Sequence, residues 1–500
     1  MLTRVVMSPQ LLNYLPLIIT ENGEFSRFAQ GKKTEHSDMV HQEMNEKLRS
    51  GDKEARIRKA VNTVRLMDTH EHLQREDNRI RGQVDVLSTF FLQYASSDLI
   101  SSGLSYSEYE TIIDPNQPLE KRWTIFSPFW ENIRNTSYAR VLNIASRDLY
   151  GDEIDDKTYK QISKRMKEAN KKGLYRWVLK EKAGIEVSLQ DTLLKAETGA
   201  FWKTLPITKL LDVDREFFVP VHRFQDFILI QDRSDIEGIA HRRGTSIHTL
   251  SDLVKNLEME FRAVSNSIAA VKLWLGYRRS IRFDKTASSE AEKVFNSIFS
   301  QTSFDRLEVD SVRMTVPEGI SLNEAKPLHD FIVHKVIQLA GEYSIPVQIH
   351  TGYHEGNENL LSNTNPLNLV NLFMEYKNVK FDLFHGGYPY IGESSALAKM
   401  FPNVYLDLAW LHIVSPHAAR EALSEWLDTV PANKILGFGG DYVFVEGTYG
   451  HSVIARDNVA RVLSQKVEDG DLRVAEAVIL AQRILRENAQ TLFLKRIGLT

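Results

Sequence analysis

Two histidines near residue 70 are the first side chains in the sequence with the spacing of metal ligands. His70 and His72 follow the apolar run Val64–Met67 and are separated by Glu71. Residues two apart in an extended chain point to the same side, so both imidazole rings can converge on one ion. A random chain with 15 histidines in 500 residues would show this spacing about 0.4 times. The pair alone therefore indicates a metal site only weakly.

Further candidate ligands follow other apolar runs. His350 and His385 each come directly after such a run, and Asp441 comes directly after Ile435–Gly440. A single buried histidine is usually a core residue with its hydrogen bonds satisfied. Four histidines and one aspartate at the ends of several strands are hard to obtain by chance. The pattern predicts that these side chains encircle one divalent ion.

Lys272 lies inside the apolar run Ile268–Leu275, where a charged amine is costly unless it is paired, neutral or modified. Three interpretations stay open. The lysine is carboxylated by CO2 and bridges two metals, or its amine contacts metal or substrate, or it forms a structural ion pair. The first of these is suggested by the family resemblance described below.

The elements that must position these residues are short apolar runs that alternate with longer helical stretches. Such alternation predicts a parallel sheet. Eight runs over more than 400 residues predict an α/β fold, a (β/α)8 TIM-like barrel whose chemistry lies at the carboxyl ends of the strands. The second run is the weakest of them. The runs are Val64–Met67, Ile185–Leu189, Phe217–Val221, Ile268–Leu275, Pro346–Ile349, Val379–Phe384, Val404–Leu408 and Ile435–Phe438.

Two segments lie outside this alternation. The stretch from Leu73 to Lys182 is far longer than an ordinary strand-to-helix loop, so we expect a mostly helical insertion after the first strand. Residues 1–60 are expected to form an N-terminal helical extension, with helices at Ser37–Arg49 and Asp52–Val64. Residues 61–500 would then form the barrel.

Composition restricts the classes of function. The chain has 62 Lys and Arg against 66 Asp and Glu, a net charge of −4, which argues against a nucleic-acid partner. The absence of cysteine excludes disulfides, Fe–S clusters, cysteine-based zinc sites and a cysteine nucleophile. No stretch approaches the roughly 20 apolar residues needed to cross a bilayer. We expect a soluble cytoplasmic protein with a small-molecule substrate and no membrane partner, and homo-oligomerisation stays open.

Taken in order along the chain, the candidate ligands resemble those of the amidohydrolase superfamily of metal-dependent barrels. Three further phrases resemble its amidohydrolase-2 branch, in particular the amidohydrolase domain that some fungi and plants fuse to a glutamine-synthetase-like domain. Uronate isomerases are similar at a greater distance. The resemblance covers about Val61 to Phe493, and because the chain stops at Thr500 we expect no synthetase-like domain. The motifs are Asp68–His72, Lys272, His350, His385, Asp441, Ile349–Tyr353, Phe384–Tyr390 and Ile484–Ala489.

The resemblance implies one or two divalent ions. Zinc is the expected metal, with Mn, Fe or Ni as alternatives, because imidazole and carboxylate ligands discriminate weakly among them. His70, His72 and Asp441 would hold a primary ion, with His350 and His385 at the same or a second site. The implied ligands are His70, His72, Lys272, His350, His385 and Asp441.

The expected chemistry is hydrolysis of an amide, lactone or ester bond in a small, carboxylate-bearing molecule. A bound divalent ion lowers the pKa of its water from about 15.7 toward 7. Asp441 would accept the proton and pass it to the leaving group, and His385 would polarise the substrate carbonyl. The alternatives are decarboxylation or uronate-type isomerisation at the same metal site, and a barrel that binds metal without catalysis.

Five residues near strand ends are candidate substrate contacts. Arg278 would bind a substrate carboxylate or act equally well as a structural clamp. Tyr353 and His354 follow the fifth strand, and His222 follows the third. Trp274 would form an apolar wall, with core packing as the alternative.

Overall fold

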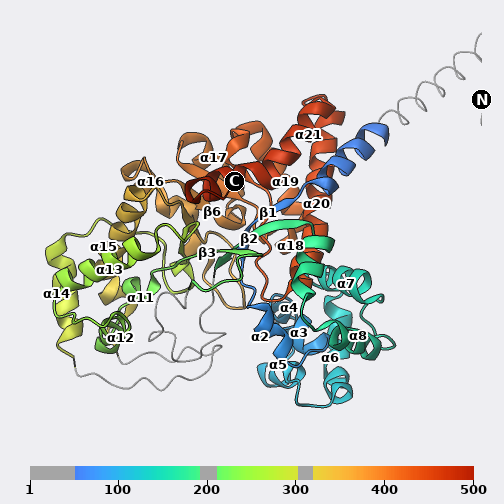
Figure 1. The fold of residues 1–500 in the computed structure, drawn as a ribbon, viewed down its shortest axis with the longest axis horizontal. Coiled ribbons are helices and arrows are strands. Elements are labelled where there is room, and N and C mark those ends of the chain that lie inside the picture. Colours follow the sequence, from blue (N-terminus) through green and yellow to red (C-terminus); the bar gives the residue numbers. More distant parts are fainter. Residues whose placement is uncertain (1–50, 192–210, 302–318, 500) are drawn as a thin grey trace, which may run out of the picture. The chain divides into compact units, whose positions relative to one another are not determined.

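The computed structural model describes residues 51–191, 211–301 and 319–499 (Figure 1). Residues 54–500 form one compact unit; of the other unit, Met1–Lys53, only residues 51–53 are described, and they are helical. Helix continues through residue 63, close to the expected bounds of Asp52–Val64. The helix expected at Ser37–Arg49 lies outside the described residues.

Within the described residues, eight short strands occur in the order expected from the sequence. Each of them overlaps one of the predicted apolar runs. Nearly all of their residues are buried, as expected for parallel strands that are covered on both faces. The strands are β1 (Leu66–Glu71), β2 (Ile185–Asp191), β3 (Phe218–Val221), β4 (Val271–Leu273), β5 (Val347–Ile349), β6 (Phe381–Leu383), β7 (Val404–Asp407) and β8 (Ile435–Leu436).

The strands form two parallel sheets, β1-β2-β3 and β4-β5-β6-β7-β8. A parallel bridge between His222 and Val271 links the two sheets after β3. On the other side, the Thr69 amide donates to the Phe438 carbonyl (3.0 Å), and the Asp441 amide donates to the His70 carbonyl (2.8 Å). The predicted mixed α/β fold with parallel strands is confirmed, whereas the assigned strands divide into sheets of three and five.

A group of helices occupies the chain between β1 and β2 and gathers on one side of β1–β3 (Figure 1). Their apolar core is rich in aromatic rings and also contains Trp410, Tyr442 and Phe444, which follow β7 and β8. This helical segment therefore packs against the carboxyl ends of those strands. Its elements are α2 (Glu76–Arg81), α3 (Val86–Phe90), α4 (Ala95–Ser101), α5 (Tyr106–Ile113), α6 (Leu119–Ile133), α7 (Ser137–Tyr150), α8 (Tyr159–Ala169) and η2 (Arg176–Lys182).

Helices also separate the later strands. The longer ones include α13 (Leu250–Val264), α15 (Leu322–Glu342), α19 (Pro416–Thr429) and α20 (Val445–Glu468). The others are α11 (Gln225–Ile228), α12 (Arg233–Arg243), α14 (Ser288–Phe299), α16 (Val370–Glu375), α17 (Ile391–Met400), α18 (Leu411–Val414) and α21 (Val474–Gln482), with short turns η4 (Leu275–Tyr277), η5 (Leu361–Thr364), η6 (Pro366–Leu369), η7 (Phe384–Gly387), η8 (Ala432–Lys434), η9 (Arg483–Glu487), η10 (Gln490–Leu494) and η11 (Lys495–Ile497).

Helix α13 shows how the sequence specifies these elements. Thr249 and Asp252 form a capping box that satisfies free amides of the first turn. Leu253, Leu257 and Phe261 recur every four residues and are all buried, so one helix face packs on the core. None of the helices in the described ranges combines the length and the apolar character needed to span a bilayer.

Candidate metal centre

The two histidines of the His-x-His motif lie side by side at the end of β1. The ring centroids of His70 and His72 are 4.6 Å apart. The His72 Nδ1 donates to the backbone carbonyl of Asp191 (2.8 Å), because a carbonyl oxygen can only accept. The lone pair of His72 Nε2 is therefore free to bind a metal. Its neighbour His70 is almost fully buried.

Asp441 places its carboxylate against both of these rings. Its Oδ1 atom is 3.4 Å from His70 Nε2 and 3.3 Å from His72 Nε2. These separations are longer than ordinary hydrogen bonds. Ligand atoms held about 2.1 Å from a tetrahedral zinc ion lie about 3.4 Å from one another. The donor atoms of this chain therefore have the spacing of a shared metal ion.

The backbone around Asp441 is held by the helical segment after β1. The Tyr94 hydroxyl and the Gln93 amide both donate to the Asp441 carbonyl. Burial alone would raise the pKa of Asp441, but His70 and His72 hold this pKa well below its usual range. The side chain is thus a carboxylate at neutral pH.

His350 and His385 direct ring nitrogens at one another. His385 Nδ1 donates to the Ala409 carbonyl (2.8 Å), and His350 Nε2 donates to the Tyr353 carbonyl (2.8 Å). The two remaining nitrogens, His385 Nε2 and His350 Nδ1, are 3.1 Å apart. Because each neutral ring has donated its proton to a carbonyl, two lone pairs face each other, and a cation between or beside them relieves the repulsion.

A proton is a poor candidate for that cation. Burial lowers the pKa of His385 to about 4 and the pKa of His350 well below its usual value. Since His385 Nε2 also lies 3.9 Å from Asp441 Oδ2, the histidine pair continues the group formed by His70, His72 and Asp441. The donor set fits a divalent ion at this place.

Asp191 at the end of β2 belongs to the same neighbourhood, and sequence reasoning missed it. One ligand atom each from His70, His72 and Asp191 lie within 4.8 Å of one another. The carboxylate accepts two hydrogen bonds from Arg223, each 2.6 Å long. Burial would raise the pKa of Asp191, but Arg223 and the histidines lower it. The signal was present, because Asp191 is the polar residue that ends the second strand; the predicted run stopped at Leu189.

Lys272 of β4 is buried with its amine directed into the interior. Its Nζ atom lies 3.2 Å from the centroid of the Phe384 ring, and no described residue forms a hydrogen bond with it. Burial lowers the pKa of this amine to about 7. The ion-pair interpretation thus finds no partner among the described residues. A modified lysine and a free amine that contacts metal or substrate both fit its surroundings.

Three strand ends carry a strained backbone. His385, Trp410 and Asp441 have φ values of 61°, 60° and 58° after β6, β7 and β8. This left-handed region costs a non-glycine residue of order 1 kcal/mol or more and is common at functional sites. Gly387 follows in the same turn, where a Cβ atom would meet the Ser394 Oγ at 2.1 Å. The tight turn therefore requires glycine behind the histidine.

Two of the predicted substrate contacts lie beside the histidine pair. The ring of His354 is 5.4 Å from that of His350, and the ring of Tyr353 is 5.5 Å from that of Trp410. Tyr277, which sequence reasoning missed, packs 4.8 Å from His350. These rings form one side of the centre.

The other three predicted contacts have different surroundings. The His222 Nε2 atom lies 2.9 Å from the Glu260 carboxylate, and its ring packs against Phe224. Trp274 stacks under the Arg223 guanidinium, 5.2 Å from its ring centroid, which links it to Asp191. Arg278 is half-buried at the end of η4.

Comparison with known proteins supports the family resemblance. Residues 309–494 match the amidohydrolase family model. Protein fluG of Emericella nidulans is 30% identical over 233 residues, which cover 45% of this chain and 26% of that protein. The match thus spans about a quarter of that relative's length. The predicted resemblance to the amidohydrolase superfamily is confirmed.

Solved structures share the fold at low sequence identity. A uronate isomerase from Thermotoga maritima matches with a TM-score of 0.68 and 15% identity, covering 88% of this chain and 97% of that one. A glucuronate isomerase from Caulobacter crescentus has a TM-score of 0.66 and 14% identity over 89% and 94% of the two chains. A protein assigned as a metal-dependent hydrolase from Lactobacillus casei has a TM-score of 0.57 and 16% identity over 88% and 97%.

Proposed function

We propose that this chain, which carries an amidohydrolase-family domain, is a metal-dependent hydrolase of small, carboxylate-bearing molecules that cleaves an amide, lactone or ester bond. One observation carries the proposal: ring nitrogens of two histidines and one carboxylate oxygen converge with the spacing of ligands that share a metal ion. Asp441 Oδ1 lies 3.4 Å and 3.3 Å from the Nε2 atoms of His70 and His72. The two histidines lie at the end of β1, the first strand, and Asp441 follows β8, the last strand, so their proximity favours a distorted (β/α)8 barrel.

His70, His72 and Asp441 would hold the ion, which we propose to be zinc, and His385 would approach it from β6. When bound, a divalent ion supplies a water of lowered pKa and a Lewis acid. His350 is close enough to His385 to complete the same site or to contribute to a second one. The imidazole and carboxylate donors suit zinc, manganese, iron or nickel.

The protein's own residues divide the remaining work. Asp441 is a carboxylate at neutral pH, so it can accept a proton from the attacking water and return it to the leaving group. His385 donates its ring proton to the Ala409 carbonyl and has none left for the substrate carbonyl that we expected it to polarise. We therefore propose His385 as a metal ligand only. The buried rings of Trp410, Tyr94 and Tyr442 pack together and keep bulk water from one side.

A second candidate function is isomerisation of a uronate at the same centre. The uronate isomerase from Thermotoga maritima aligns with 88% of this chain, which favours this alternative. Both functions involve an acidic substrate, and we propose the Arg223 guanidinium, which lies over Trp274 and donates to Asp191, as a cation for the substrate carboxylate. The two reactions differ in whether water is consumed.

Heavy-oxygen water separates the candidates. The purified protein, with its metal content measured, is incubated with panels of lactones, dipeptides, uronates and hydroxybenzoates in H2(18)O, and products are analysed by mass spectrometry. We expect turnover with one 18O atom in the acid product, and its loss in His70→Ala. Interconversion of uronates without solvent label in a newly formed acid would replace the hydrolase by the isomerase. Stoichiometric metal without any turnover would contradict both.

A further inference from the structure

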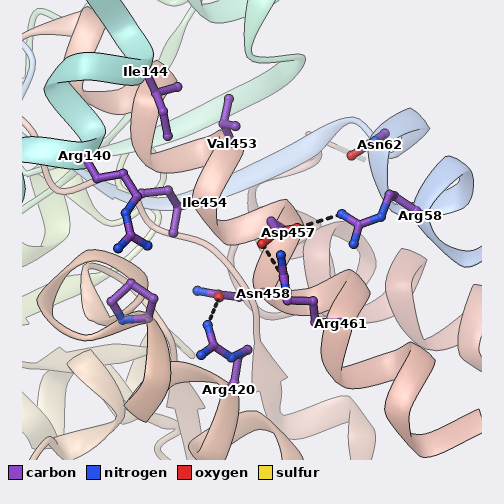
Figure 2. Close-up of a pocket in the computed structure, with 11 residues that line it drawn as sticks. Arg58, Asn62, Arg140, Ile144, Arg420, Val453, Ile454, Asp457, Asn458 and Arg461 are labelled. Carbon is purple, nitrogen blue, oxygen red and sulfur yellow. Dashed lines mark hydrogen bonds and ion pairs between the residues drawn. The ribbon is translucent and has the colours of Figure 1, made fainter. Parts of the chain in front are cut away.

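A pocket of about 510 Å³ lined by arginines lies outside the metal centre. Figure 2 shows guanidinium groups reaching it from four helices: Arg58 from residues 51–63, Arg140 from α7, Arg420 from α19 and Arg461 from α20. Among the described residues that line it, Asp457 alone carries a carboxylate. We call this cavity the arginine pocket; its other lining residues are Asn62, Ile144, Pro416, Val453, Ile454 and Asn458.

The single carboxylate of the arginine pocket is already shared. Asp457 accepts from Arg58 NH1 through Oδ1 and from Arg461 Nε through Oδ2, and both distances are 2.7 Å. Arg58 has a second ion pair with Glu54 at 2.9 Å, while Arg461 is mostly exposed. These two guanidinium groups therefore have local counter-charges, which leaves the other two arginines of the pocket uncompensated.

Arg140 and Arg420 extend toward the space beside Asn458 without a carboxylate partner (Figure 2). Arg420 NH1 donates to the neutral Asn458 Oδ1 at 2.9 Å. The Arg140 guanidinium has no hydrogen bond or ion pair with any described residue. A concave surface of one sign concentrates its field, so an anion gains more here than on a convex surface. Guanidinium groups also match the geometry of phosphate oxygens in a bidentate manner.

Apolar side chains complete the wall of the arginine pocket. Ile454 is almost fully buried, and Ile144 and Val453 are half-buried beside it. Asn458, only 2% exposed, accepts a hydrogen bond from the Arg420 guanidinium and so fixes its position. The volume of about 510 Å³ is within the range of sites that hold small organic ligands. The pocket thus combines an anion-binding side with an apolar side.

We propose that the arginine pocket binds a small organic phosphate, a ligand site separate from the metal centre. The Arg140 and Arg420 guanidinium groups donate to the phosphate oxygens, and the apolar body of the ligand lies against Ile144, Val453 and Ile454. The site holds its ligand through contacts that the hydrolytic chemistry does not use.

The test measures binding of phenyl phosphate to the metal-containing protein by isothermal titration calorimetry. We expect the double variant Arg140→Gln/Arg420→Gln to bind at least about tenfold more weakly than wild type, because each lost charged hydrogen bond is worth more than 1 kcal/mol. Arg147→Gln is the matched control, since Arg147 lies on α7, is half-exposed and does not line the pocket. Its affinity should equal that of wild type, and turnover should be unchanged in all of these variants.

Three other results would overturn the proposal. Equal affinity of the double variant and Arg147→Gln would place any binding elsewhere, including at the metal, where these arginines make no contact. If inorganic phosphate binds as tightly as phenyl phosphate, the apolar wall contributes nothing to binding, and an organic ligand is contradicted. Binding to vesicles containing phosphatidic acid, without binding of soluble phenyl phosphate, would assign the pocket to a lipid headgroup. Circular dichroism of each variant verifies that it is folded.

Discussion

The candidate metal centre and the helical segment between β1 and β2 both bury charged groups. They differ in how far these groups are hydrogen-bonded to other residues of the protein. In the helical segment, the Asp85 carboxylate accepts from Arg122 and from the amides of Leu87 and Ser88. Arg122 also donates to backbone carbonyls through its Nε and NH1 groups. The charged groups of Asp85 and Arg122 therefore have their partners within the protein.

At the metal centre the partners are incomplete. His70 Nδ1 and the Lys272 amine have no hydrogen-bond partner among the described residues, and one oxygen of Glu71 lacks one as well. The backbone at His385 and Asp441 is also strained. Leaving buried polar groups unsatisfied costs free energy, so the three unsatisfied atoms near this strained backbone are consistent with the proposed ligand site. The two regions therefore differ in whether their buried polar atoms have hydrogen-bond partners, which the Asp85–Arg122 pair has and the candidate metal centre lacks in part.

The largest expected effect is on the functional side of this comparison. Asp441→Asn removes the proton acceptor and one charged ligand, so turnover should fall by about 10³-fold or more. The folding midpoint should change little, because the carboxamide keeps the shape of the side chain. Steady-state kinetics, metal analysis and thermal unfolding measure these quantities. Asp428→Asn, an equivalent change at an exposed carboxylate that pairs with Lys466, should leave turnover intact. An active Asp441→Asn enzyme would contradict the role given to this carboxylate.

The structural side should respond in the converse manner. Asp85→Ala leaves the buried Arg122 guanidinium without its carboxylate, which should cost about 3–5 kcal/mol of unfolding free energy. Denaturant unfolding measures this loss. Turnover per folded molecule and metal content should remain near those of the wild type. Loss of metal in a folded Asp85→Ala protein would show that the two regions are not independent.

Sequence reasoning succeeded where local pattern decides. The apolar runs predicted the strands, and polar residues at their carboxyl ends were expected to meet. His70 and Asp441 do approach each other, and His385 connects His350 to Asp441. It missed Asp191 by ending the second run too early. Whether each of these side chains binds metal stays a prediction.

Contacts made across elements could not be predicted from spacing. The Tyr94 and Gln93 side chains reach the Asp441 carbonyl from a helical segment more than 340 residues away in sequence. His222 follows β3, the position from which we predicted a substrate contact. Its ring nitrogen lies 2.9 Å from the carboxylate of Glu260, which belongs to α13. Periodicity reports which face of an element is buried, and it does not report which neighbour a side chain meets there.

A buried histidine outside the candidate metal centre allows a test by pH. His329 of α15 donates Nε2 to the Ile230 carbonyl, and burial lowers its pKa to about 4. The unfolded chain, with a histidine pKa near 6.5, binds the proton more readily. The contribution to stability is therefore full above pH 6.5 and is lost as the pH falls toward 4. We expect the free energy of unfolding to fall between pH 7.5 and pH 5 by about 2 kcal/mol less in His329→Gln than in wild type. Denaturant unfolding at the two pH values measures this difference.

The smallest effect is expected from an exposed ion pair in the same helical segment as Asp85. Glu131 and Arg134 of this segment are 3.0 Å apart, and their side chains are 65% and 49% exposed. Water and salt screen such a pair, so Glu131→Ala should change the unfolding free energy by less than about 0.5 kcal/mol. Raising the salt concentration should reduce even this difference, while the effect of Asp85→Ala persists. A Glu131→Ala loss as large as that of Asp85→Ala would mean that burial does not set the strength of these ion pairs, and the contrast between satisfied and unsatisfied buried charge would lose its physical basis.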